Sequence, residues 1–191
     1  YHYMDWYQIP KLLDHPYWSE PYYDDGGGEM MMTTYSRPLY DSEGKLYGML
    51  IADLSLVWLT DLVGGIQAFD NSYNLMVSRN ASFIVHPNRE LILNETIFSS
   101  TYGDTDKSLS KMQDDMLNGR AGEVLRDNKG GKYFVFYSPV ETTQWTVAIV
   151  CPRSELYAEV KILRGMLIIL GIIALLLMIA FIYNGIRKVV A

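Results

Sequence analysis

Aromatic rings and acidic side chains crowd one short segment, residues 5–25. Its sequence, DWYQIPKLLDHPYWSEPYYDD, holds seven aromatic rings, counting His15, together with five acidic side chains and three prolines. The faces of Trp and Tyr rings attract cations by about 0.5–2 kcal/mol per ring, and a carboxylate adds a charge-assisted hydrogen bond. An amine-bearing ligand would suit this set. The alternative is that the rings form the small core of a loop-rich region.

Other chemistry has little support in the residue types. His2, His15 and His86 lack the spacing of metal ligands. The glycines at 26–28 are not followed by Lys-Ser/Thr, so they predict a flexible loop rather than a phosphate-binding turn. No serine stands in the context of a nucleophile elbow. We therefore predict no catalytic site, no metal site and no cofactor in this chain.

The three prolines predict that residues 5–25 form an elaborated loop rather than a helix. An internal repeat indicates where this loop stands in the order of strands and helices. In each copy a strand containing Tyr-Ser and a proline leads through a turn into a second strand and then a helix. The features of the first copy lie at residues 35–39, 46–52 and 54–63, and those of the second lie at 137–140, 145–150 and from 153 onward. The first copy holds only the end of this plan, so we expect its earlier strands and helix upstream of residue 1.

The second copy is the more complete. Period-2 patterns and turn residues predict strands at 72–78, 82–85, 122–126, 132–137 and 145–150. Apolar residues at helical spacing predict a helix at 105–118, with Asp104 or Asp106 as its N-cap. This order predicts an α+β fold, in which a five-stranded antiparallel sheet has helices packed on one face.

The charge of the chain is unevenly distributed. Residues 1–160 hold all 22 Asp and Glu but only 12 of the 16 Lys and Arg. This acidity argues against nucleic acid as a partner.

An uncharged segment follows at residues 165–183, with the sequence GMLIILGIIALLLMIAFIY. As a helix it would be about 28 Å long, which matches the core of a bilayer. A buried core helix is the alternative, but the segment has no polar face. Basic residues flank both ends equally, so their count does not orient the span, and we expect the acidic residues 1–160 to lie outside. The chain lacks an initial Met and stops in a continuing helix, so we interpret it as a piece of a longer protein.

These features together resemble the double Cache (dCache) sensor domains. The resemblance rests on Trp6-Tyr7, on 18–24 (WSEPYYD), 35–39 (YSRPL) and 48–56 (GMLIADLSL), and in the second half on 137–140 (YSPV) and 144–152 (QWTVAIVCP). It implies two PAS-like modules stacked on a membrane helix in a bacterial receptor. The implied domains are the end of a membrane-distal module (1–66), a membrane-proximal module (67–152), a juxtamembrane helix (153–164), the transmembrane helix (165–183) and the start of a cytoplasmic, HAMP-like helix (184–191).

The resemblance also implies particular ligand-binding residues. In members that bind amino acids, an Arg two residues before the Trp-Tyr pair holds the ligand carboxylate, and an Asp at the end of the distal module's last strand holds the amine. Asp53 matches the Asp, whereas Met4 stands in the place of the Arg, which favours an amine or an uncharged polar ligand. Asp53 could instead cap a helix that begins at Leu54 or Ser55. The candidate ligand-binding residues are Trp6, Tyr7, Trp18, Tyr22, Tyr35 and Asp53.

The predicted function is that of an extracytoplasmic sensor that relays ligand binding through the transmembrane helix to a cytoplasmic output. We expect residues 1–160 to lie outside a bacterial inner membrane, in a homodimeric receptor whose partners are a small molecule and the membrane. We expect no enzyme activity in this chain, although the output could be a histidine kinase, a phosphatase or a cyclase. The alternatives are a membrane-anchored extracellular binding protein or enzyme and a ligand-free structural spacer.

Overall fold

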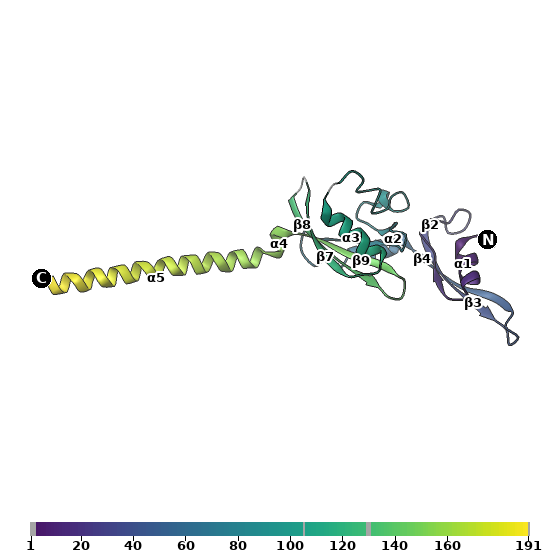
Figure 1. Ribbon diagram of the computed structural model, residues 1–191, viewed down its shortest axis with the longest axis horizontal. Coiled ribbons are helices and arrows are strands. Elements are labelled where there is room, and N and C mark those ends of the chain that lie inside the picture. The colour runs from purple at the N-terminus through teal and green to yellow at the C-terminus, as the bar shows by residue number, and fades with distance from the viewer. Residues whose placement is uncertain (1–2, 105, 129–130, 191) are drawn as a thin grey trace. The chain divides into compact units, whose positions relative to one another are not determined.

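The computed structural model describes residues 3–104, 106–128 and 131–190. The chain divides into two compact units, Tyr1–Pro152 and Arg153–Ala191. The first unit holds two antiparallel sheets with flanking helices, which confirms the predicted α+β class (Figure 1). The two sheets follow the order of the two predicted modules, and the module boundary at residues 66 and 67 stays a prediction.

Sheet 1, with four strands, is built around β3 (Met31–Tyr40). This strand pairs along its length with β4 (Leu46–Ser55), and it also pairs with the short strands β1 (Tyr17–Trp18) and β2 (Tyr22–Tyr23). Asp41 closes the β3–β4 turn, because its carboxylate accepts the backbone N–H groups of Glu43 and Lys45 at 3.0 and 2.9 Å. Gly44 in the same turn has a φ of +78°, a conformation that glycine adopts without strain.

Residues 5–13 contradict the prediction of a loop, because they form α1 (Asp5–Leu13) with Pro10 inside it. An interior proline removes a helical hydrogen bond and costs about 3 kcal/mol. Tertiary packing outweighs this local preference, since Pro10 is among the most buried side chains of the protein and α1 packs against β3. The helix ends at Asp14, which has a left-handed conformation with φ 54°.

Sheet 2 has five strands in the order β6-β5-β9-β8-β7. These are β5 (Tyr73–Val77), β6 (Phe83–Val85), β7 (Gly122–Asn128), β8 (Gly131–Val140) and β9 (Trp145–Pro152), which confirms all the strands predicted for the second copy. A short 3-10 helix, η1 (Arg89–Leu91), follows β6. The predicted helix at 105–118 is α3 (Lys107–Leu117), with Asp106 as its N-cap through the N–H of Ser108 at 2.9 Å. Its predicted first residue, Thr105, lies outside the described residues.

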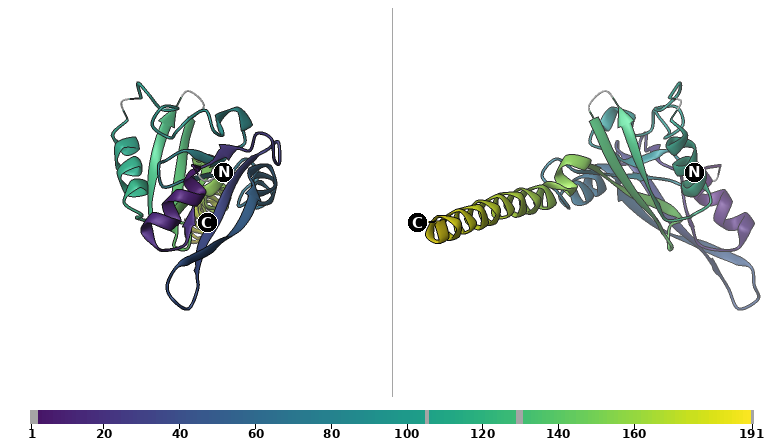
Figure 2. Two further views of the ribbon diagram at one scale, coloured as in Figure 1. Left: turned by 90° about the vertical axis from the view of Figure 1, so that its right-hand side faces the viewer. Right: turned by 60° about the vertical axis from the view of Figure 1, so that its left-hand side comes forward.

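The helices lie on opposite faces of sheet 2, which corrects the prediction that they pack on one face (Figure 2). Neighbouring strand residues point to opposite faces. Accordingly Leu75 and Val77 join the core beneath α3, whereas Met76 joins the core beneath α2 (Leu56–Gly64). The packing of α2 on this second face could not be predicted from the second copy of the repeat, because α2 belongs to the first copy.

The second unit contains α4 (Arg153–Leu156) and α5 (Ala158–Val190). Within α5, Val160–Ile182 is long and apolar enough to span a membrane. Its mean hydropathy is 3.1, and none of it is buried against the rest of the protein. This span overlaps the predicted one at 165–183. The helix continues through the predicted HAMP-like start as far as Val190, and Ala191 lies outside the described residues.

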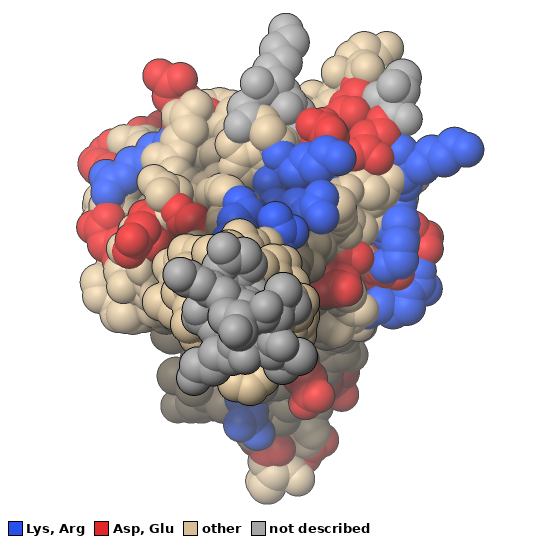
Figure 3. Space-filling view, turned by 90° about the vertical axis from the view of Figure 1, so that its left-hand side faces the viewer, with Lys and Arg blue, Asp and Glu red and all other residues tan. Residues whose placement is uncertain are grey.

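On the face of the molecule in Figure 3, groups of basic side chains alternate with groups of acidic ones.

Candidate ligand-binding site

The structure brings three of the six candidate residues to one cavity in sheet 1. Trp6 comes from α1, Tyr22 from β2 and Asp53 from β4. The cavity has a volume of about 710 Å³, within the range of small-molecule sites. Its lining is made up of Tyr3, Met4, Trp6, Tyr22, Tyr23, Asp24, Asp25, Ile51 and Asp53.

A hydrogen-bonded chain fixes Asp53 in this cavity. Thr34 lies directly opposite Asp53 in the β3–β4 ladder, and its hydroxyl donates to Asp53 Oδ1 at 2.7 Å. Because the single hydroxyl proton of Thr34 is used in this bond, its oxygen accepts the hydroxyl of Tyr22, also at 2.7 Å. Thr34 is buried and Asp53 is exposed. The buried hydroxyl therefore anchors the carboxylate of Asp53, which lines the cavity.

The hydroxyl of Tyr22 remains a proton donor in this arrangement. Burial raises the pKa of Tyr22, the hydrogen bond with Thr34 opposes this shift, and the negative charges of Asp53 and Asp24 raise the pKa further. The phenol therefore stays protonated at neutral pH.

The acidic loop after β2 places Asp24 at the cavity. The carboxylate of Asp24 accepts the N–H of Gly28, and Glu29 Oε1 accepts the N–H of Gly26 at 2.9 Å. A Cβ at Gly27 would lie 2.2 Å from Asp24 Oδ2, so a side chain there would displace the carboxylate. The glycines at 26–28, predicted to be a flexible loop, thus form a hydrogen-bonded turn.

The charges at the cavity are of one sign. Asp24, Asp25 and Asp53 line it, and no described residue of the lining is Lys or Arg. Met4 also lines the cavity, in the place where the resemblance implied an arginine. Carboxylates and ring faces together attract a cation. A ligand carboxylate would find no cationic partner among these residues.

Tyr7, Trp18 and Tyr35 are not among the residues that line this cavity. The ring of Tyr7 packs edge-on against Trp6, with centroids 6.1 Å apart. Trp18 lies between the two sheets, where its ring centroid is 5.4 Å from that of Tyr35 and 5.1 Å from that of Trp145 in β9.

Asp53 does not cap α2, which corrects the alternative reading of its role. Ser55 is the N-cap, and its hydroxyl accepts the N–H of Trp58 at 3.4 Å. Six residues of the lining were not among the candidates: Tyr3, Met4, Tyr23, Asp24, Asp25 and Ile51. Ile51 lies two residues before Asp53 on the same strand, so strand periodicity could have placed both on one face.

The described residues contain no group of three or more His, Cys, Asp and Glu that could hold a metal ion. The single cysteine, Cys151, is fully buried in β9, as a small apolar residue would be.

Comparison with known proteins identifies a family. The family model of the Cache domain, dCache_1, matches residues 2–160. The methyl-accepting chemotaxis protein PscA of Pseudomonas syringae pv. tomato is 23% identical over 153 residues, which make up 80% of this chain and 23% of that protein. The chain therefore spans about a quarter of the length of this curated relative.

Solved structures agree with the family match. The extracellular domain of mmHK1S-Z3, a candidate histidine kinase, is 28% identical with a TM-score of 0.70, over 83% of this chain and 57% of that one. The ligand-binding domain of Mlp24, solved with asparagine, is 22% identical with a TM-score of 0.60, over 84% of this chain and 60% of that one. Because the Mlp24 domain is only 22% identical to this chain, its similarity shows a shared fold and nothing more.

Proposed function

The chain belongs to the Cache domain family, and from this premise we propose that it is the extracytoplasmic ligand-sensing region of a bacterial membrane receptor. Its described residues form a sensor fold followed by one helix that can span a membrane. The cavity around Asp53 is the ligand site of this sensor. The receptor is a homodimer in the inner membrane, and its catalytic activity, if it has one, belongs to an output domain rather than to this chain.

The ligand carries an amine and lacks a free α-carboxylate. The observation that carries this proposal is the charge of the cavity, with Asp24, Asp25 and Asp53 on its walls and no Lys or Arg among the described lining residues. Asparagine, which the Mlp24 domain holds, offers both an ammonium and a carboxylate group. An ammonium group would bind Asp53 and the ring of Trp6 here, whereas a carboxylate would meet Met4 and like charges.

Ligand binding reaches the membrane helix through the contacts between the two sheets. β4 carries Asp53 and continues directly into α2, which packs on sheet 2. Trp18, next to the cavity-lining strand β2 in the chain, contacts Trp145 at the start of β9. β9 ends at Pro152, where the chain enters α4 and then α5. A shift of β4 or of Trp18 on ligand closure would move β9.

A thermal-shift screen of the 191-residue protein in nanodiscs tests the ligand class. The panel compares the amines propylamine and putrescine with the amino acid asparagine. We expect amines to raise the Tm, and we expect Asp53→Asn to remove that increase while Asp70→Asn, at an exposed position away from the cavity, retains it. An amino acid as the strongest ligand would replace the amine assignment. No stabilisation by any amine or amino acid would favour a ligand-free spacer, and turnover of a compound would favour an enzyme.

A further inference from the structure

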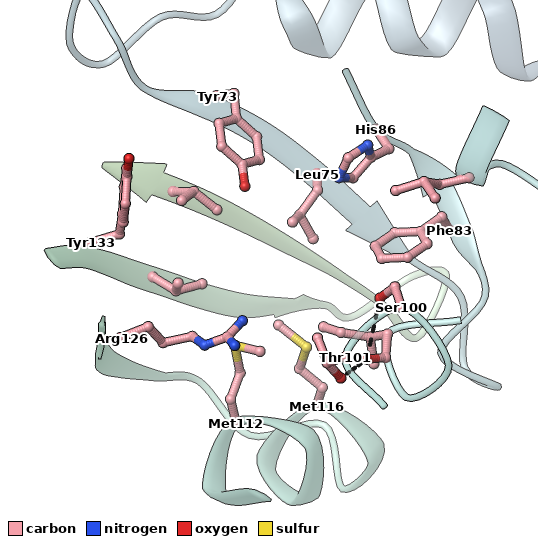
Figure 4. A pocket seen from close by; sticks show the side chains of 14 residues that line it. Tyr73, Leu75, Phe83, His86, Ser100, Thr101, Met112, Met116, Arg126 and Tyr133 are labelled. Atoms are coloured by element: carbon pink, nitrogen blue, oxygen red, sulfur yellow. Dashed lines mark hydrogen bonds between the residues drawn. The ribbon is translucent and has the colours of Figure 1, made fainter. Parts of the chain in front are cut away.

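A second cavity lies between sheet 2 and α3, and it has a different character (Figure 4). Its volume is about 340 Å³, at the small end of the range for ligand sites. Apolar side chains make up most of its wall, including Leu75, Phe83, Met112 and Met116. Among the described residues that line it there is no Asp or Glu, whereas Arg126 supplies a positive charge.

The guanidinium of Arg126 is only partly satisfied by the protein. Its Nη2 forms an ion pair with Asp104, which does not line the cavity. Its Nε is buried and has no hydrogen-bond partner. A buried donor left unpaired costs about 1–3 kcal/mol, and a small rotation of the side chain that turned Nε towards a ligand acceptor would recover this cost. Figure 4 shows the side chain of Arg126 extending from β7 into the space beside Met112.

Tyr73 and His86 line the same space. The hydroxyl of Tyr73 points into the cavity in Figure 4. Burial raises the pKa of Tyr73, the charge of Arg126 opposes the shift, and Tyr133 adds to it, so the phenol keeps its proton. Nδ1 of His86 lies 3.0 Å from the backbone nitrogen of Asn88 and 3.2 Å from its carbonyl oxygen, and burial lowers the pKa of His86 while the backbone of Asn88 opposes this shift, which favours the neutral ring.

We propose that this cavity is a second ligand site, for a small aliphatic carboxylate. The carboxylate would accept from Arg126 Nε and the hydroxyl of Tyr73, while the alkyl chain would contact Leu75, Phe83 and Met116. Arginine is well suited to a carboxylate because its N–H groups form a planar fork. The site has the opposite charge preference to the cavity around Asp53, and it does not depend on the ligand proposed there.

Isothermal titration calorimetry on the 191-residue protein in nanodiscs tests this site, with acetate, propionate, butyrate and hexanoate as probes. Propionamide is the neutral control, because it retains the shape and the carbonyl acceptor of propionate without its charge. We expect at least one carboxylate to bind with a stoichiometry of one per chain, and propionamide to bind about tenfold more weakly or not at all.

Two variants assign the binding to this cavity. Arg126→Lys keeps the charge opposite Asp104 but removes the Nε donor, and we expect it to weaken carboxylate binding about tenfold or more. Tyr73→Phe keeps the ring and should weaken binding about three- to tenfold. Asp53→Asn, in the other cavity, should leave carboxylate affinity unchanged. The proposal is overturned if no carboxylate binds, if propionamide binds as well as its acid, if Arg126→Lys and Tyr73→Phe both bind like the wild type, or if Asp53→Asn abolishes binding.

Discussion

Thr34 is the residue on which the geometry of the Asp53 cavity depends. It is buried, and it links the carboxylate of Asp53 to the hydroxyl of Tyr22 through two hydrogen bonds of 2.7 Å. A hydroxyl that both donates and accepts orients both neighbours at once. The carboxylate of Asp53 at the cavity is therefore positioned by a residue that does not itself line the cavity.

We predict that Thr34→Val, which keeps the shape of the side chain, will loosen the site. Without the hydroxyl, Asp53 and Tyr22 both lose a partner, which should cost about 1–2 kcal/mol of stability and lower amine affinity about three- to tenfold. Urea unfolding and calorimetry measure the two effects. Thr34→Ser retains the hydroxyl and should behave like the wild type, so equal losses in both variants would argue that the methyl group, and not the hydrogen bonds, matters.

The ring of Trp6 has its own prediction. Trp6→Ala should weaken amine binding about three- to thirtyfold, because it removes one cation–π face and its contact area. Tyr47→Ala serves as the control, since Tyr47 is 84% exposed and is not part of the lining. Calorimetry with propylamine makes the comparison, and an unchanged affinity in Trp6→Ala would remove this ring from the site.

At the scale of elements, a buried carboxylate joins α3 to β8. Asp115 accepts from the hydroxyl of Tyr137 at 2.6 Å, from Lys111 Nζ at 2.7 Å and from Arg120 Nε at 2.9 Å. These hydrogen bonds, with that from Lys111 the largest, hold the pKa of Asp115 well below its usual value. The charged form of Asp115 thus stabilises the packing of α3 on the sheet.

The depressed pKa of Asp115 predicts acid sensitivity. Its contribution to stability is fully present above the unfolded-state pKa of about 4 and is lost as the pH falls below that value towards the folded-state pKa. Asp115→Asn should lower the Tm at pH 7 by roughly 3–8 °C and should flatten the fall in Tm between about pH 4 and pH 2. Scanning calorimetry across this range checks both, with Asp70→Asn as the control. Parallel pH profiles in the wild type and Asp115→Asn would contradict the account.

The contact between Trp18 and Trp145 joins the two sheets, and a double-mutant cycle measures it. With Trp18→Leu and Trp145→Leu we expect a coupling energy of about 0.5–1.5 kcal/mol in unfolding experiments. If this contact carries the ligand signal, Trp18→Leu will also retain amine binding while it reduces the ligand-dependent output of the receptor. Full output in that variant would exclude the contact from the relay.

Particular residues show what the sequence could predict at this scale. The strands of sheet 2 and the cap at Asp106 were predictable because their signals are local. The helix through Pro10 and the place of Trp18 were not, because burial against β3 and the distant Trp145 decide them. Asp53 could equally have been a cap, and only the structure shows that Ser55, two residues later, takes that position.

At the scale of the whole molecule, the apolar span Val160–Ile182 follows the Cache fold in the chain. We predict that Ile172→Asp, near the middle of the span, will impair insertion, because a carboxylate there costs about 2.5–3.5 kcal/mol. Carbonate extraction of membranes should release a larger share of Ile172→Asp than of Ile172→Leu. Equal retention of the two variants would indicate that this helix is not in the membrane.

The two cavities carry opposite charges. The cavity at sheet 1 is lined by carboxylates that include Asp53, and the cavity at sheet 2 is lined by Arg126. The central claim concerns the first of these. Its most direct test is calorimetric titration of propylamine, or of whichever amine stabilises the protein most, into the wild type, Asp53→Asn and Arg126→Lys. The account predicts binding of one amine per chain, a loss of about tenfold to a hundredfold in Asp53→Asn, and an unchanged affinity in Arg126→Lys. Equal affinity in the wild type and Asp53→Asn, or no amine binding at all, would contradict it.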